Sequence, residues 1–148
     1  CVGDHVAVLW PAGKGEAEVI GPAEVQQRYG VTPGQVPDFI ALRGDPSDGL
    51  PGARGIGEKT ARDLLRDHES LDALLAAAGS PRTDLRPRVR AALTDDADAL
   101  RAYREIATLR HVDLPRPPDA PTTWAAAADA ARERGMNRLA ERLASHAA

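Results

Sequence analysis

Two aspartates, Asp45 and Asp48, lie three positions apart in a segment rich in glycine and proline. Carboxylates held close together repel each other unless a cation or hydrogen-bond donors compensate their charge. Oxygen ligands with this spacing suit Mg²⁺ or Mn²⁺. An aspartate beside glycine and proline is also typical of an Asx turn or a helix cap. The spacing alone favours the turn and leaves the metal site as the alternative.

The next segment, LPGARGIGEKTARDLL over residues 50–65, has the pattern of a helix-hairpin-helix. Gly55 and Gly57 let the backbone turn tightly and approach another molecule, and we expect Ile56 to anchor the turn in the core. A helix that begins near Glu58 has free N–H groups and a dipole that together suit a DNA phosphate. A lone Gly-x-Gly would indicate only a tight turn between helices.

The residues after the turn favour DNA binding over a plain turn. Lys59, Arg62 and Arg66 follow at i, i+3 and i+7, so one helix face is expected to be basic. The contacts would go to phosphates and not to base edges, so binding is expected to be independent of sequence. The predicted DNA-binding residues are Gly55, Ile56, Gly57, Glu58, Lys59, Thr60 and Arg62.

Composition sets limits on the protein class. The 148 residues suit a modest core, and the hydrophobic content of 43% argues against general disorder. Aromatic residues make up only 3%, so the core must be built from Ala, Leu and Val. A net charge of −3 argues mildly against a generic nucleic-acid coat but leaves room for a local basic face.

The expected location is cytoplasmic and nucleoid-associated. The single cysteine, Cys1, cannot form an internal disulfide, which indicates a reducing compartment. The sequence contains no run of about 18 apolar residues, so no membrane span is predicted. Because the chain begins with Cys1 and not with Met, we expect that sequence upstream is missing.

The elements that would position these residues are mostly helical. Residues 6–10 are expected to form a buried strand, paired with residues 16–20 as a hairpin at the edge of a sheet. A loop is expected over residues 44–57 and an extended linker over residues 110–121, which hold four prolines. The expected helices cover residues 22–29, 35–43, 58–67, a segment after the predicted N-cap Ser70, 81–93, 95–109, 123–134 and 137–146.

Residues 44–61, GDPSDGLPGARGIGEKTA, closely resemble the bacterial 5′→3′ exonuclease and flap endonuclease family, which includes the 5′-nuclease domain of DNA polymerase I. The resemblance extends to VAVL at residues 6–9, to YGV at residues 29–31, to LDALL at residues 71–75 and to VDLP at residues 112–115, and it is weak after about residue 81.

This resemblance implies a mostly α, helix-hairpin-helix (SAM-like) C-terminal domain with a short N-terminal β remnant of the nuclease α/β sheet. Residues 1–21 would be the end of the PIN-like nuclease domain, and residues 22–148 the helical DNA-binding domain. The implied partner is double-stranded DNA with a 5′ flap or 5′ end. A monomer without membrane association is expected.

The resemblance also implies cofactors. The family cuts DNA with two divalent metals, Mg²⁺ or Mn²⁺, and Asp45 and Asp48 match positions that help to hold the second metal. Family members also hold K⁺ in the hairpin through backbone carbonyls. The positions that match those carbonyls are Leu42, Arg43, Pro51, Ala53 and Ile56.

The sequence departs from the family in what it lacks. The other metal ligands and the helical arch precede the strand at Val6 in the family, so we expect these 148 residues to be nearly inactive as a nuclease. Gly49 also replaces an Asn that often follows the second aspartate. The preference between flap cutting and exonuclease trimming depends on the arch. The end of the chain after Leu143, without a linker, favours a stand-alone parent enzyme over one linked to a polymerase.

Two other functions compete with this interpretation. One is a non-catalytic helix-hairpin-helix module, in which Asp45 and Asp48 only cap the loop. The other is a structural domain that docks a partner protein through its alanine-rich C-terminal helices.

Several remaining side chains carry weaker expectations. Arginines 82, 86, 88 and 90 are expected to form a solvated helix face, with an extension of the DNA-binding face as the alternative. Trp10 and Trp124 are expected in the core, and the four histidines show no ligand spacing.

Overall fold

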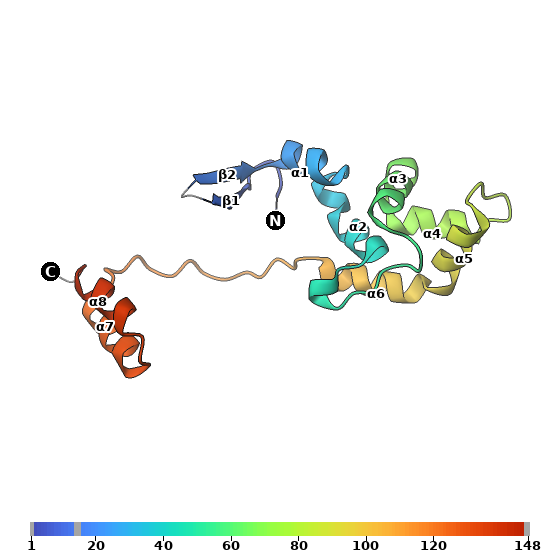
Figure 1. Ribbon diagram of the computed structural model, residues 1–148. Helices are drawn as coiled ribbons and strands as arrows, with labels where there is room; N and C mark the ends of the chain where they lie inside the picture. Colours follow the sequence, from blue (N-terminus) through green and yellow to red (C-terminus); the bar gives the residue numbers. More distant parts are fainter. Residues whose placement is uncertain (1, 14–15, 147–148) are drawn as a thin grey trace. The chain divides into compact units, whose positions relative to one another are not determined.

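The computed structural model describes residues 2–13 and 16–146 (Figure 1). Their contacts divide the chain into two compact units, Cys1–His111 and Val112–Ala148. Among the described residues, the first unit has a two-stranded hairpin and six α-helices, and the second has two α-helices. The predicted mostly α fold with a small β element is therefore confirmed. None of the described helices is both long and apolar enough to cross a membrane.

The N-terminal element is an antiparallel hairpin of β1 (Val8–Gly13) and β2 (Glu16–Ile20). The predicted pairing of these segments is confirmed, although the first strand begins two residues later than expected and continues past Pro11. Residues 14 and 15, which belong to the expected turn, lie outside the described residues.

The expected burial of the first strand is wrong. Leu9 is 69% exposed and Trp10 is 55% exposed, so Trp10 is not a core residue. A two-stranded sheet needs a second layer to cover its apolar side chains. The helix that contacts β2 is α1 (Pro22–Tyr29), and it leaves most of the hairpin open to solvent.

Helical segments make up the rest of the first unit. Ser70 caps α4 as predicted, because its Oγ accepts a hydrogen bond from the N–H of Ala73 at 3.2 Å. The helices after α1 are α2 (Val36–Arg43), which follows a 3₁₀ turn at Pro33–Gln35, α3 (Glu58–His68), α4 (Leu71–Gly79), α5 (Pro87–Asp95) and α6 (Ala97–Ala107).

The helix expected over residues 81–93 begins only at Pro87. Two short side chains satisfy the preceding backbone locally, because Ser80 Oγ accepts from the N–H of Arg82 and Thr83 Oγ1 accepts from the N–H of Leu85. Such local hydrogen bonds compete with helix formation. Pro87 then suits the first helical position, where no N–H partner is needed.

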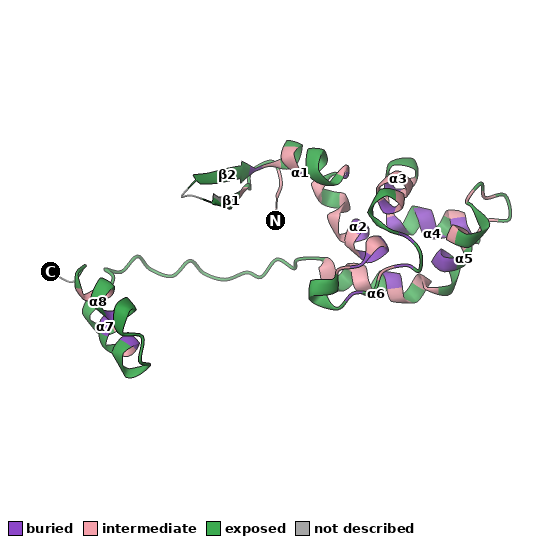
Figure 2. Ribbon diagram, viewed as in Figure 1, coloured by how far each residue is buried: buried purple, intermediate pink, exposed green. Residues whose placement is uncertain are grey.

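The core of the first unit is built largely from leucine and alanine, as the composition predicts. Figure 2 shows buried residues on each of α2, α3, α4, α5 and α6. Phe39, the single phenylalanine, is 1% exposed, and Ala41 and Ala61 let helices approach closely. The fully buried leucines at its centre are Leu42, Leu65, Leu71, Leu74, Leu93 and Leu100.

A buried carboxylate joins three of these helices. Asp38 on α2 is 8% exposed, and its Oδ2 accepts a hydrogen bond from the N–H of Leu71 at 2.9 Å. Arg104 on α6 donates to Asp72 at 2.7 Å and places Nη1 3.8 Å from Asp38 Oδ1. The hydrogen bond to Asp72 raises the pKa of Arg104. Asp38 and Ser70 therefore cap α4 together.

The second unit is a short helical hairpin of α7 (Trp124–Glu133) and α8 (Asn137–Ala144). Its buried residues are the small side chains Ala128, Ala131 and Ala140. Trp124 is 37% exposed and lies 5.1 Å from the ring of His146, so its expected core position is wrong. Small alanines leave no space between the helices for an indole ring.

The chain between the units has no regular structure from residue 108 to residue 123, in agreement with the predicted linker. The contacts divide within this segment, after His111. The predicted family boundary between residues 21 and 22 is a different division of the chain, and it stays a prediction.

Two glycines hold the loop between α2 and α3 in place. Gly44 and Gly52 have φ values of +83° and +71°. A Cβ on Gly52 would lie 2.4 Å from Gly44 N and 2.6 Å from the carbonyl carbon of Arg43. The N–H of Ala53 donates to the carbonyl oxygen of Leu42 at 2.8 Å, which fixes this approach. The loop therefore returns to its own start.

We expect Gly52→Ala to lower the free energy of unfolding by at least about 2 kcal/mol, through the clash and the positive φ together. Thermal and urea denaturation of the full chain measure it. Gly34→Ala is the matched control, since nothing lies within 4 Å of its added Cβ and its φ is ordinary. Equal midpoints for the two variants would contradict the close approach.

Asp38→Ala should destabilise the chain by about 2 kcal/mol, because it leaves the N–H of Leu71 buried without an acceptor. Asp38→Asn keeps an acceptor oxygen and should cost less. Ser70→Ala, which removes the solvent-exposed hydrogen bond to the N–H of Ala73, provides the comparison at about 1 kcal/mol. An Asp38→Ala variant as stable as the parent would show that the buried cap contributes nothing.

Candidate nucleic-acid interface

The hairpin between α2 and α3 has the geometry that the sequence predicts. Gly55 has a φ of +78°, and the N–H of Ile56 donates to the carbonyl oxygen of Ala53 at 3.0 Å. Ile56 is 3% exposed, so its expected role as the anchor of the turn is confirmed. Gly55 and Gly57 on either side of it are exposed. Ile56 thus anchors the hairpin in the core, while the backbone at Gly55 and Gly57 is exposed to solvent.

The first turn of α3 presents unpaired backbone donors. Gly57 is its N-cap and supplies no side-chain hydrogen bond. The first backbone bond of the turn runs from Ala61 N to Gly57 O at 2.9 Å. Within the described residues, no acceptor is found for the N–H groups of Glu58, Lys59 and Thr60. These groups and the helix dipole form a site of positive potential.

Glu58 lies in this positive region, where its negative charge favours the helix N-terminus. Its Oε2 is 3.8 Å from Nη1 of Arg43. The guanidinium of Arg43 in turn lies over the ring of Phe39, 5.0 Å from the ring centroid. Arg43 therefore faces the carboxylate of Glu58 from the end of α2 and offsets part of its charge.

The predicted basic face of α3 is only partly realised. Lys59 is exposed and Arg62 is half-buried, and within the described residues neither forms an ion pair. Arg66 lies 3.0 Å from Asp63 and 3.2 Å from Asp67, and the hydrogen bond to Asp67 is the main cause of its raised pKa. The expected contribution of Arg66 to a basic face is therefore wrong, because two acids neutralise it.

Arg62 also has a packing role that the spacing did not indicate. A Cβ built on Gly30 would lie only 1.9 Å from Cδ of Arg62. The aliphatic part of the arginine therefore runs across the backbone at the end of α1. Burial of the stem leaves the charged head as the part available to a ligand.

Asp45 is a cap in this structure. Its Oδ1 accepts from the N–H of Ser47 at 3.0 Å and from Ser47 Oγ at 2.6 Å. The hydrogen bond from the Ser47 hydroxyl is the main cause that lowers the pKa of Asp45. The Asx-turn alternative is confirmed for Asp45, and it starts the 3₁₀ turn Pro46–Asp48.

Asp48 lies in the same loop, exposed and two residues before Leu50. Reciprocal backbone hydrogen bonds between Asp45 and Leu50, at 2.8 and 2.9 Å, close this loop. Among the described residues, no group of three or more acidic, histidine or cysteine side chains is placed to hold a metal ion. The metal role of Asp45 and Asp48 stays a prediction.

The backbone carbonyls predicted to hold K⁺ come from two segments that the structure brings into contact. Leu42 and Arg43 end α2, and Pro51 and Ala53 lie on the returning loop beside them. Leu42 O accepts from Ala53 N at 2.8 Å, and Ala53 O accepts from Ile56 N at 3.0 Å. Each carbonyl oxygen keeps a second lone pair. The arrangement is compatible with a cation, whose binding stays a prediction.

Two arginines beside the hairpin were not among the predicted DNA-binding residues. Arg54 lies within the hairpin itself, and Arg88 on α5 reaches Gly55. The position of Arg54 inside the glycine-rich run was the available signal. Arg88 was expected on a solvated face, and its contact with the hairpin depends on how α5 packs. Arg90, by contrast, donates from Nε to the carbonyl oxygen of Ala78 at 2.8 Å, so it caps the C-terminal end of α4.

Comparison with known proteins supports the family that the motifs indicate. A family model described as 5′-3′ exonuclease, C-terminal SAM fold, matches residues 31–129. This range contains α2 to α6 and the hairpin, and it extends well past residue 81, where the visible resemblance weakens.

Full-length relatives show the same similarity. DNA polymerase I of Mycobacterium tuberculosis (strain ATCC 25618 / H37Rv) is 41% identical over 119 residues, which cover 80% of this chain and 13% of the polymerase. The thermostable DNA polymerase I of Thermus aquaticus is 42% identical over 112 residues, covering 76% of this chain and 12% of the polymerase. A 5′-3′ exonuclease of Streptomyces coelicolor (strain ATCC BAA-471 / A3(2) / M145) is 39% identical over 113 residues, covering 76% of this chain and 37% of the exonuclease.

The chain thus spans a small part of the polymerases and just over a third of the exonuclease. The matched family model covers more than half of the chain and includes the hairpin with its flanking helices. The chain belongs to the 5′-3′ exonuclease family and carries its C-terminal SAM fold.

Proposed function

We propose that this chain is the DNA-binding part of a 5′→3′ exonuclease or 5′-flap endonuclease, and that it holds the backbone of duplex DNA. The observation that carries the proposal is the first turn of α3. Its N–H groups have no acceptor in the described part of the chain, and Lys59 and Arg62 beside them have no acidic partner there. A phosphate group satisfies both kinds of donor.

The distribution of ion pairs favours the same surface. Several arginines away from the hairpin, among them Arg66, Arg101 and Arg104, lie within 4 Å of acids. Lys59 and Arg62 next to the hairpin form no ion pair in the described residues, although the whole chain has a net charge of −3. A local basic site on an acidic protein is suited to binding a short stretch of the DNA backbone, and it is not suited to coating a long nucleic acid.

The cleavage chemistry belongs to the parent enzyme in this proposal. Divalent metal ions in a two-metal site activate water and stabilise the leaving oxygen in phosphodiester hydrolysis. Asp45 and Asp48 would supply part of the second site for Mg²⁺ or Mn²⁺, since each keeps at least one carboxylate oxygen without a partner in the described residues. The carbonyls near Gly52 would hold K⁺ between the protein and a phosphate.

A non-catalytic helix-hairpin-helix module is the second candidate. It is favoured by the hydrogen bonds from Ser47 to Asp45, which give that carboxylate a structural role without any metal. Both candidates require the same duplex contact at α3. They differ in whether Asp45 and Asp48 bind a divalent cation.

The duplex contact is tested by the double variant Lys59→Ala, Arg62→Ala. At low salt it should bind a labelled 5′-flap duplex at least about tenfold more weakly, and the slope of log affinity against log salt should fall by about 2. Fluorescence anisotropy over a KCl series measures both. Arg66→Ala is the matched control on the same helix, because Asp63 and Asp67 already pair with Arg66. Unchanged affinity in the double variant would remove α3 from the interface.

The divalent site is tested by titration calorimetry with Mn²⁺ on the chain and on Asp45→Asn. We expect weak binding that Asp45→Asn abolishes. Because Ser47 lowers the pKa of Asp45, the carboxylate stays ionised in mildly acidic solution, so the affinity should change little between about pH 7.5 and 5.5. No Mn²⁺ binding to the parent chain would favour the non-catalytic module.

Cleavage is read in a parallel reaction with the flap duplex, K⁺ and Mn²⁺. We expect a complex without product from this chain. Product that disappears in Asp45→Asn would show that these residues contain a complete active site, contrary to the expectation of near inactivity.

A further inference from the structure

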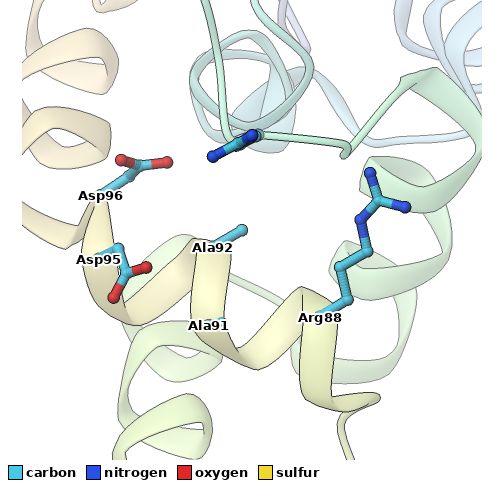
Figure 3. Close-up of a pocket in the computed structure, with 6 residues that line it drawn as sticks. Arg88, Ala91, Ala92, Asp95 and Asp96 are labelled. Carbon is cyan, nitrogen blue, oxygen red and sulfur yellow. The ribbon is translucent and has the colours of Figure 1, made fainter.

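A cavity of about 440 Å³ lies between the hairpin and α5, outside the α3 surface described above (Figure 3). Its lining combines cationic, small and acidic side chains. The lining residues are Arg54, Arg88, Ala91, Ala92, Asp95 and Asp96.

The guanidinium of Arg88 lies directly against the backbone of the hairpin. A Cβ built on Gly55 would be 3.4 Å from Arg88 Nη2 and 3.5 Å from Arg88 Nε. Arg88 lies in the first turn of α5, and Figure 3 shows its side chain extending away from the helix. The cation of α5 and the exposed turn of the hairpin therefore lie next to each other.

The two arginines of the cavity are exposed, and neither has an ion-pair partner among the described residues. The nearest acids along α5, Asp95 and Asp96, lie at its opposite end in Figure 3. Among the described residues, neither acid forms an ion pair within 4 Å with Arg54 or Arg88. Arg88 and the two acids thus lie at opposite ends of α5, and neither arginine of the cavity is paired with an acid of its lining.

We propose that Arg54 and Arg88 bind a second backbone phosphate of the DNA, next to the phosphate bound at the start of α3. This inference rests on the proposed duplex contact and extends it to α5. Guanidinium groups match the geometry of phosphate oxygens and bind them through paired N–H donors. Gly55 lies three residues before Glu58 in the hairpin, so the two phosphate positions belong to one continuous surface.

The remaining lining residues determine how the strand lies on this surface. Ala91 and Ala92 are small and leave the space open. Asp95 and Asp96 repel a phosphate, so the DNA strand is expected to lie nearer to Arg88 than to these two acids. Replacement of either aspartate by a neutral residue should therefore change the affinity for DNA.

The test is binding of the full 148-residue chain to the labelled 5′-flap duplex, by anisotropy over a KCl series. Arg88→Ala and Arg54→Ala should each weaken binding about tenfold at low salt. The double variant should lose less than the product of the two single losses, because both arginines contact one phosphate. Arg88→Lys keeps the charge but loses the paired N–H donors of the guanidinium, so its affinity should lie between those of Arg88→Ala and the parent.

Two further variants make the result specific to this cavity. Asp95→Asn removes repulsion and should tighten binding about twofold, a gain that a folding defect would not produce. Arg101→Ala, whose charge is paired with Asp98 and Asp72, is the control that should leave binding unchanged. Thermal midpoints equal to the parent confirm that each variant is folded.

The outcomes separate this inference from the proposed function. If the parent chain binds and Lys59→Ala weakens it, while Arg88→Ala and Arg54→Ala bind like the parent, the second phosphate site is wrong and the α3 contact stands. If the parent chain does not bind DNA at low salt, both proposals fail. Weakening by Arg88→Ala and Arg54→Ala together with tightening by Asp95→Asn supports the site.

Discussion

The approach of two backbone segments, at Gly44 and Gly52, is the constraint on which the candidate interface depends. Backbone atoms of the returning loop lie where any side chain would collide with the end of α2. This contact fixes where the loop re-enters the core at Ile56, and Ile56 fixes where α3 begins. The donors of α3 and the carbonyls of the loop therefore belong to one rigid arrangement. Two residues without side chains thus position a surface that is rich in polar backbone groups.

Much of this arrangement could be predicted because it is local. The glycine pair around Ile56, the helix start at Glu58 and the N-cap Ser70 each depend on residues within a few positions, and the structure confirms their geometry. The exposure of Trp10 could not be predicted, since it depends on which layer covers the hairpin. The late start of α5 at Pro87 followed from hydrogen bonds to Ser80 and Thr83, which compete with helix over six residues.

The charges were harder to predict than the elements. Spacing placed Arg66 on the same face as Lys59, yet Asp63, three residues before it, and Asp67, the next residue, both pair with it. Spacing also could not show that Arg88, more than thirty residues beyond the hairpin, contacts Gly55. A charge is available to a ligand only if tertiary structure leaves it unpaired, and that information is absent from periodicity. The motif therefore predicted the backbone geometry of the candidate site, whereas periodicity did not show which of its cations are unpaired.

The hydrogen bond from Leu71 to Asp38 has a consequence for folding. These residues are 33 positions apart, and the whole hairpin lies between them. When the N-terminus of α4 docks on α2, it closes a loop that contains the Asp45 turn, the glycine pair and α3. The entropy of closing this loop is offset only when its interior is ordered as well. The candidate interface should therefore form and unfold in one cooperative step with the core, so the hydrogen-bonded amides of α3 should exchange with solvent deuterium together with those of α4.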